Sequence, residues 1–134
     1  MAGETNLAKL LASMSPQVLE QEYVFCCIAD AAYGDLKELN PLAAFAETEG
    51  LTLVVPRPQA DAHGLAYESV FKAITLTVHS SLDAVGLTAA VASKLAEHGI
   101  SANVIAAYYH DHIFVQAERV EQALAALGEF AEQG

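Results

Sequence analysis

The stretch that decides the fold runs from residue 72 to residue 99 and reads KAITLTVHSSLDAVGLTAAVASKLAEHG. From Ile74 to His79 apolar residues alternate with threonine and histidine, a pattern that predicts a strand with one buried face. Small and turn-forming residues then break the alternation up to Gly86. From Leu87 the apolar residues recur with the period of a helix, which Gly99 ends. The stretch therefore predicts a strand, a loop and a helix whose N-terminus faces the loop.

The residues that follow extend this pattern into a complete α+β unit. Strands are predicted at Ala102–Tyr109 and His112–Ala117, joined by a tight turn at His110-Asp111, and a last helix at Glu118–Ala131. The resulting βαββα order has an antiparallel hairpin and both helices on one face, which is most of a ferredoxin-like βαββαβ sandwich. The unit lacks a closing strand of its own, so we expect the first half of the chain to supply one.

The first half has a less regular pattern. We expect a divergent N-terminal unit with a leading helix at residues 1–66 and a C-terminal unit at residues 67–134, the two being interlocked. Candidates for the closing strand are Tyr23–Ile28 and Leu51–Val55, both strongly apolar. The elements expected in the first half are a helix at Asn6–Met14, a further turn from Ser15-Pro16, a strand at Glu22–Ile28, a helix from Asn40 to Gly50, a strand at Leu51–Val55 and a polar connector at Gln59–Ala66.

Composition and charge narrow the function classes. The formal net charge is −11, from 17 acidic and 6 basic residues, so a nucleic acid or an anionic membrane is not an expected partner. No apolar run approaches the ~20 residues that span a bilayer. Residues 1–6 lack the basic and apolar regions of a signal peptide. These features predict a cytoplasmic protein.

Neither a metal site nor a catalytic site is predicted. His110-x-His112 offers two ligands, whereas a closed zinc site needs four, and the turn position explains Asp111 and its neighbours equally well. The adjacent Cys26 and Cys27 fit two small thiols in a strand. Residues 79–83 hold a histidine, serines and an aspartate, but closeness in sequence does not assemble a nucleophile with its base. We therefore expect no catalytic residues, no metal and no cofactor.

Three segments of the second half resemble the ACT domain, a small regulatory module of amino-acid metabolism. They are Ser81–Thr88, Gly99–Ile105 and the hairpin Tyr108–Val115. The Gly-Leu-Thr helix start and the hairpin are similar to those of stand-alone tandem-ACT proteins of uncharacterised role. The resemblance is specific over residues 71–130 and looser over residues 20–65.

The resemblance implies a ligand site at the start of the second-half helix. Free N–H groups at a helix N-terminus accept a carboxylate, and a glycine lets the ligand approach the backbone. The residues implied are Val85, Gly86, Leu87 and Thr88 for an α-carboxylate, Asp83 for an α-ammonium group, Asn103 for a polar contact, and His79 and Ser80 in the same pocket. The alternative is that Gly86 only permits a sharp turn, with Asp83 placed by the helix dipole. The corresponding turn in the first half, Ala32–Asp35, lacks this helix start, so we expect no equivalent site there.

Two functions are consistent with these residues. The resemblance implies a non-catalytic regulatory protein that binds a small molecule, with an amino acid as the first candidate, and that pairs edge to edge as a homodimer. The alternative is a structural dimerisation module without a ligand. A ligand that binds the folded form raises its melting temperature, and this effect separates the two.

Overall fold

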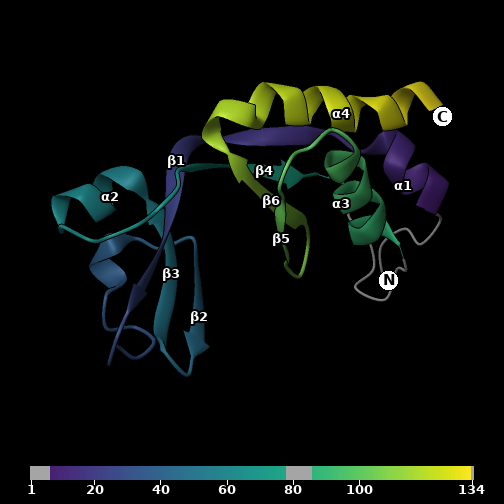
Figure 1. The fold of residues 1–134 in the computed structure, drawn as a ribbon. Coiled ribbons are helices and arrows are strands. Elements are labelled where there is room, and N and C mark those ends of the chain that lie inside the picture. Colours follow the sequence, from purple (N-terminus) through teal and green to yellow (C-terminus); the bar gives the residue numbers. More distant parts are fainter. Residues whose placement is uncertain (1–6, 78–85, 134) are drawn as a thin grey trace. The chain divides into compact units, whose positions relative to one another are not determined.

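The structure of the 134-residue chain is a computed structural model that describes residues 7–77 and 86–133 (Figure 1). In hydrogen-bond order its six strands run β2-β3-β1-β4-β6-β5 in an antiparallel sheet. This confirms the α+β class. Along the chain the elements are α1 (Leu7–Ser13), β1 (Pro16–Ile28), the 3-10 helix η1 (Lys37–Leu39), β2 (Ala43–Glu47), β3 (Gly50–Pro56), α2 (Arg57–Ala62), β4 (Phe71–Leu76), α3 (Leu87–Glu97), β5 (Asn103–Ala106), β6 (Asp111–Gln116), the 3-10 helix η2 (Ala117–Arg119) and α4 (Val120–Gln133).

The chain divides into two compact units. One, here called the terminal unit, contains residues 1–19 and 72–134, and the other, the inserted unit, contains residues 20–71. Residues 7–19 therefore belong to the same compact unit as the second half of the chain. Strand β1 begins in the terminal unit and ends in the inserted unit.

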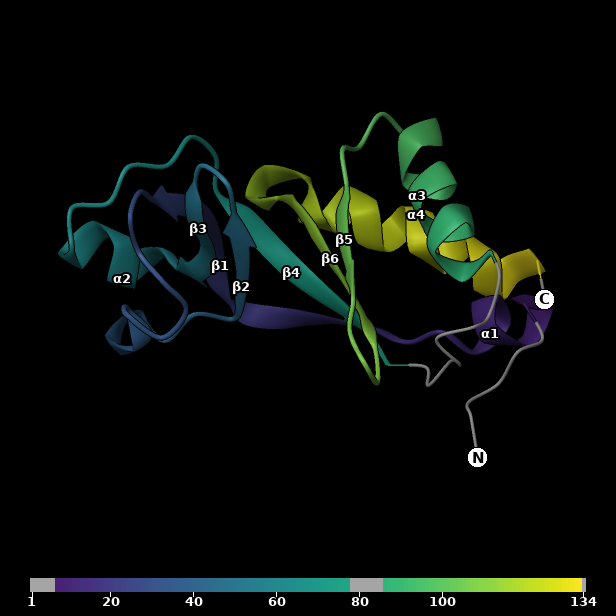
Figure 2. The same cartoon turned by 90° about the horizontal axis from the view of Figure 1, so that it is seen from below.

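The terminal unit follows the predicted β-loop-α-β-β-α order. Helices α3 and α4 lie on the same side of β4, β5 and β6, and α1 lies next to α4 (Figures 1 and 2). Apolar side chains from the strands and both helices form one buried cluster between these layers. Its members are Ile74, Leu76, Leu87, Val91, Leu95, Ile100, Ile113, Val115, Ala123, Ala126, Leu127 and Phe130. The alternation predicted in β4 and the helical period predicted in α3 thus point to the same core.

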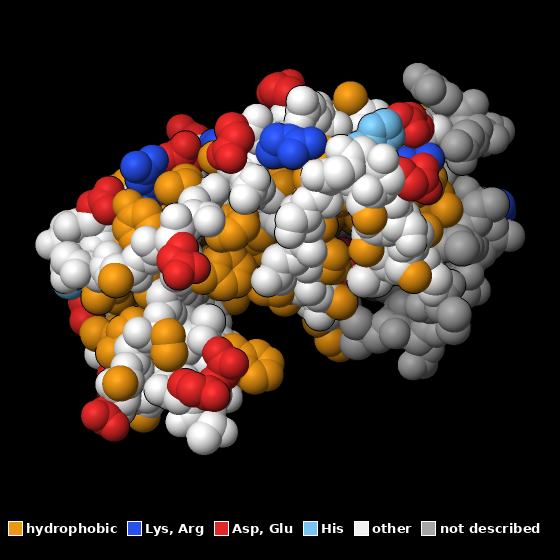
Figure 3. Space-filling model, in the orientation of Figure 1, with side chains coloured by type: hydrophobic (Ala, Val, Ile, Leu, Met, Phe, Trp, Pro, Cys, Tyr) orange, Lys and Arg blue, Asp and Glu red, His pale blue; other side chains and the backbone are white. Residues whose placement is uncertain are grey.

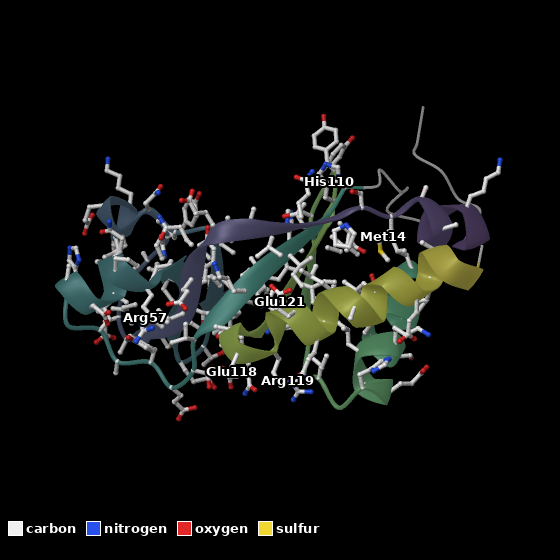
Figure 4. The ribbon with its side chains drawn as sticks, turned by 90° about the horizontal axis from the view of Figure 1, so that it is seen from above. Met14, Arg57, His110, Glu118, Arg119 and Glu121 are labelled. Carbon is white, nitrogen blue, oxygen red and sulfur yellow. The ribbon has the colours of Figure 1, made fainter. Side chains whose placement is uncertain are left out.

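The start of β1 belongs to this unit. The backbone N–H and the hydroxyl of Thr77 donate to the Ser15 carbonyl at 3.3 and 2.5 Å. Met14 packs against the terminal core and lies next to α4 (Figure 4). The expected helical turn after Ser15-Pro16 is wrong, because Pro16 opens a strand, a position where a missing N–H removes no ladder bond. The first-half strand next to β4 in the sheet is β1, which contains the candidate Tyr23–Ile28, whereas the candidate Leu51–Val55 lies in β3, on the other side of β1.

The inserted unit contains a hairpin where a helix was expected. Residues 43–47 form β2 and pair antiparallel with β3, so the helix predicted from Asn40 to Gly50 is wrong. Gly50, where that helix was expected to end, pairs with Glu47 and begins β3. A Cβ at Gly50 would lie 2.7 Å from the Ile28 carbonyl oxygen, and its φ of +152° also suits glycine. Pairing with β3 overrides a weak helical pattern here.

The polar connector predicted at Gln59–Ala66 is also partly wrong. Residues 57–62 form α2, with Pro58 within its first turn, where the missing N–H has no intrahelical partner to lose. Arg57 at its start donates to Glu22 at 3.0 Å and to the Tyr67 hydroxyl at 3.3 Å, and Tyr67 donates to Asp61 at 2.6 Å (Figure 4). This network ties α2 to β1 within the inserted unit. The buried cluster beneath it consists of Val24, Cys26, Leu39, Leu51, Leu53, Val55 and Ala60.

Candidate functional site

The N-terminus of α3 is shaped by Gly86. This residue is the N-cap of the 11-residue helix and has φ 101° and ψ −14°, a left-handed conformation that favours glycine. Its carbonyl accepts the first helical hydrogen bond, from the Ala90 N–H at 2.8 Å. Gly86 offers no side chain to cap the helix, and the first turn carries no acidic residue. The first N–H groups of α3 therefore point out of the helix without an intrahelical acceptor.

Two residues next to Gly86 have separate roles. The Leu87 side chain is buried in the terminal core and anchors the first turn. The Thr88 hydroxyl donates to Asp111 Oδ2 at 3.4 Å, which is a long hydrogen bond. Among the described residues, Thr88 is the hydrogen-bond donor to the Asp111 side chain. An acidic group therefore lies beside the positive end of α3.

Asp111 is the residue that sequence reasoning missed at this site. Its exposed fraction is 9%, although a carboxylate is rarely buried without close partners. The position of Asp111 in the sequence predicts a turn residue. The signal for a buried acid was its alternation with Ile113 and Val115, which both face the terminal core. Because side chains two residues apart share a face, this pattern places an acid on the helix-covered face.

The other predicted site residues fall into two groups. His79, Ser80, Asp83 and Val85 lie outside the described residues. Asn103 is described, and the β5–β6 register pairs it with Phe114, whereas Asp111 pairs with Ala106 at the opposite end of the hairpin. Within this chain, the structure therefore brings Gly86, Leu87, Thr88 and Asp111 together and leaves Asn103 apart from them.

The histidines of the hairpin have distinct surroundings. His110 lies at the β5–β6 turn, and its Nδ1 is buried without a hydrogen-bond partner among the described residues (Figure 4). His112 Nδ1 lies 2.9 Å from the Thr75 hydroxyl. Burial lowers the pKa of His112, and the neighbouring His110 adds to this effect, while Asp111 opposes it. Within residues 7–77 and 86–133, no group of three or more His, Cys, Asp or Glu side chains is arranged to hold a metal ion.

The other end of α3 is fixed by charged groups. Lys94, 8% exposed, forms an ion pair with Glu129 of α4 at 3.2 Å and lies over the Phe130 ring. His98 Nε2 lies 3.0 Å from the other oxygen of Glu129. Arg119 donates to the His98 carbonyl at 3.3 Å, close to the C-terminus of α3 (Figure 4). These contacts hold α3 against α4 and so fix the direction in which its N-terminal amides point.

Comparison with known proteins identifies family models and solved structures that resemble this chain. An ACT domain family model matches residues 2–72 and a second ACT domain family model matches residues 68–129. No curated protein matches the chain. A solved structure from Vibrio cholerae, of a protein of unknown function described as a possible transport protein, is 60% identical, with a TM-score of 0.85 over 93% of this chain and 95% of that one.

More distant solved structures share the fold alone. A protein from Agrobacterium tumefaciens has a TM-score of 0.74 at 15% identity, covering 88% of this chain and 89% of its own. The ligand-free regulatory subunit of aspartate kinase from Thermus thermophilus has a TM-score of 0.64 at 10% identity, covering 89% and 97%. None of the described helices is long and apolar enough to cross a membrane. With two family models in tandem over residues 2–129, the chain belongs to the ACT domain family and carries two such domains.

Proposed function

We propose that this chain is a non-catalytic regulatory protein that reversibly binds a free amino acid at the N-terminus of α3. The ACT domain matches support a regulatory, ligand-binding role in general. The observation that carries the amino-acid proposal is that helix amides without a capping side chain among the described residues lie beside a buried acid, Asp111, at the same helix turn.

The chemistry of this pair suits a zwitterion. The α-carboxylate would accept hydrogen bonds from the backbone N–H groups of residues 85–88, whose positive dipole end favours an anion. Gly86 lets the carboxylate approach the backbone closely. The α-ammonium group would pair with Asp111 or with Asp83, since an ammonium group donates three hydrogen bonds and a carboxylate accepts them. His79, Ser80 and Asn103 remain candidates for contacts to the rest of the ligand, Asn103 from a neighbouring copy.

A homodimer in the cytoplasm is part of the proposal. Strands β2 and β5 stand at the two ends of the strand order, so each has a backbone edge that favours pairing with another strand. Near β5, Tyr108 and Tyr109 are exposed and stack edge to face at 5.0 Å. Binding of a ligand between two copies would change their relative stability, and a partner would detect that change.

A melting scan against the twenty amino acids tests the proposal. A ligand at about one hundred times its Kd stabilises the folded form by about 2.7 kcal/mol, which raises Tm by about 10 °C for a chain of this length. Gly86→Asp should remove the shift, because it places a competing carboxylate at the helix N-terminus. Gly99→Asp is the matched control: Gly99 also has positive φ and open space around it, at the other end of α3.

The outcomes separate the two functions. A shift from one or a few amino acids that survives in Gly99→Asp and is lost in Gly86→Asp supports the proposed site. Shifts retained in both variants would place binding elsewhere. Absence of a shift from all twenty amino acids would reject the amino-acid ligand and leave the structural dimerisation module, which sedimentation of the unliganded protein would then characterise.

A further inference from the structure

The inserted unit contains a pocket of about 260 Å³ that is separate from the α3 N-terminus. Its apolar wall is formed by Leu36, Leu51 and Leu53, with Ala44 on β2. Tyr33 and Lys37 are the polar side chains that line it. All of these residues lie between β1 and the middle of β3, so the pocket belongs to one compact unit. Figure 3 shows hydrophobic side chains at the surface over this unit.

The pocket exists because a short 3-10 helix covers the sheet where a longer helix was expected. Between β1 and β2 the three-residue η1 is the helical element, and it seals the sheet with one side chain, the fully buried Leu39. Residues 43–47, expected to form the rest of a covering helix, instead extend the sheet as β2. The face that carries Leu51 and Leu53 therefore keeps an opening beside η1.

The polar groups at the pocket are hydrogen-bond donors. Lys37 has no ion pair within the described ranges, although the chain carries a net charge of −11. The Tyr33 side chain is 84% exposed, so its hydroxyl is free to meet a ligand. The nearest acid in sequence, Asp35, is already used, because its Oδ2 accepts the Ala32 N–H at 2.8 Å. An ammonium group and a phenol hydroxyl above an apolar wall suit an acceptor oxygen with a negative charge.

The volume limits the apolar part of the ligand. An apolar cavity of about 150 Å³ is sufficient to hold benzene, so about 260 Å³ admits a ring of that size with a short chain attached. Ligand pockets are mostly apolar with a few polar groups that fix orientation, and this one has that composition. We propose that the pocket binds a small monocarboxylate whose apolar body is a single aromatic ring, with the carboxylate at Lys37. The ring lies against Leu51 and Leu53, and no amino group is needed.

Phenylpropanoate is the probe for this site, with phenylpropanol as the uncharged analogue. Titration of the full chain, followed through the backbone amide NMR signals, should shift residues 33–37 and 51–53. The alcohol should bind about twofold to fivefold more weakly, the size of effect expected for a solvent-exposed ion pair. Lys37→Met should reduce the affinity for the acid to that for the alcohol. Lys9→Met, at an exposed position of α1, is the matched control for the loss of one charge. It should change neither the affinity for the acid nor the affinity for the alcohol.

A second pair of variants tests the cavity itself. Ala44→Phe fills the pocket mouth and should weaken binding of both probes by about tenfold or more, because the ring occupies the ligand's space. Ala43→Phe is the matched control, since it makes the same change one residue earlier in β2, on the opposite face, where the cross-strand partner is Val54 and not a residue of the pocket. Melting curves of both variants show whether they fold alike.

The results either support or overturn the proposal. Selective loss of binding in Ala44→Phe, with the acid-over-alcohol preference lost in Lys37→Met, supports it. Equal binding in Ala44→Phe and Ala43→Phe, signal shifts confined to α3, or no shifts with phenylpropanoate would overturn it. The amino-acid site at α3 is in the other unit, so the variants separate the two sites. A Tm shift from an aromatic amino acid that is lost in Gly86→Asp belongs to α3, and one that is lost in Ala44→Phe belongs to the pocket.

Discussion

Replacing Gly86 by alanine is expected to destabilise the fold, because of the backbone conformation at that residue. Gly86 has φ 101° and ψ −14°, a conformation that residues with a Cβ rarely adopt. The left-handed conformation costs a residue with a side chain about 1–2 kcal/mol relative to glycine. For 134 residues the entropy of unfolding is about 0.28 kcal/mol per kelvin, so Tm should fall by about 4 to 7 °C.

The matched control is the same substitution at Gly128, in the middle of α4. No φ in the left-handed range is found there, and an added Cβ meets nothing within 4 Å. Glycine inside a helix is about 0.5–1 kcal/mol less favourable than alanine, so Gly128→Ala should raise Tm by about 2 to 4 °C. The two changes therefore have opposite signs although each adds one methyl group.

Thermal unfolding followed by circular dichroism, with urea denaturation for the free energy, provides the assay. The double variant should show the sum of the two effects within about 0.5 kcal/mol, since a Cβ at Gly128 meets nothing within 4 Å and the two residues lie on different helices. A Gly86→Ala variant as stable as the unchanged protein would refute the reasoning, because the α3 N-terminus would then not require a left-handed residue.

Three further predictions concern packing and pH. Leu95→Ala, at a fully buried position of α3, should lower the free energy of unfolding by about 2–5 kcal/mol, as measured by urea denaturation. Burial lowers the pKa of His112 in the folded chain, so as pH falls the unfolded chain binds a proton before the folded chain does. The free energy of unfolding should therefore decrease as pH drops below about 6.5. In His112→Asn, the Tm measured at several pH values should decrease less over the same range. The hydrogen bond from Lys94 is the main cause that holds the pKa of Glu129 below its ordinary 4.5. The ionised Glu129 therefore stabilises the fold above pH 4.5, and this contribution is lost as pH falls through the folded pKa. If Tm decreased with acid in Glu129→Gln as much as in the unchanged protein, this prediction would be contradicted.

The second half of the chain could be predicted because its local patterns agree with its tertiary contacts. The alternation before residue 77, the helical period from Leu87 and the stop at Gly99 all match β4 and α3. The hairpin that follows was also found, with β5 shorter than expected, at Asn103–Ala106. Each apolar pattern here is long enough to select one period.

The first half was harder because its patterns are short. Between Asn40 and Gly50 the apolar residues Leu42, Phe45 and Ala46 matched a helix, but the structure places Phe45 and Ala46 in β2, where pairing with β3 decides the conformation. At the candidate site, the sequence indicated Gly86, Leu87 and Thr88 through the helix start. It did not indicate Asp111, because that residue comes near the helix only through the pairing of β6 with its neighbours.

The division of β1 between two units has a consequence for the order of folding during synthesis. Residues 20–71 form a contiguous segment, so the inserted unit has all of its residues once that segment has left the ribosome. Residues 7–19 leave first, yet their partners lie in residues 72–133 and follow last. Contacts so far apart in sequence form slowly, because a long loop must close. The earliest part of the chain to be made is therefore among the last to acquire its native contacts. A nascent chain halted when residues 20–71 have just left the ribosome should resist protease over these residues while residues 7–19 are still cleaved.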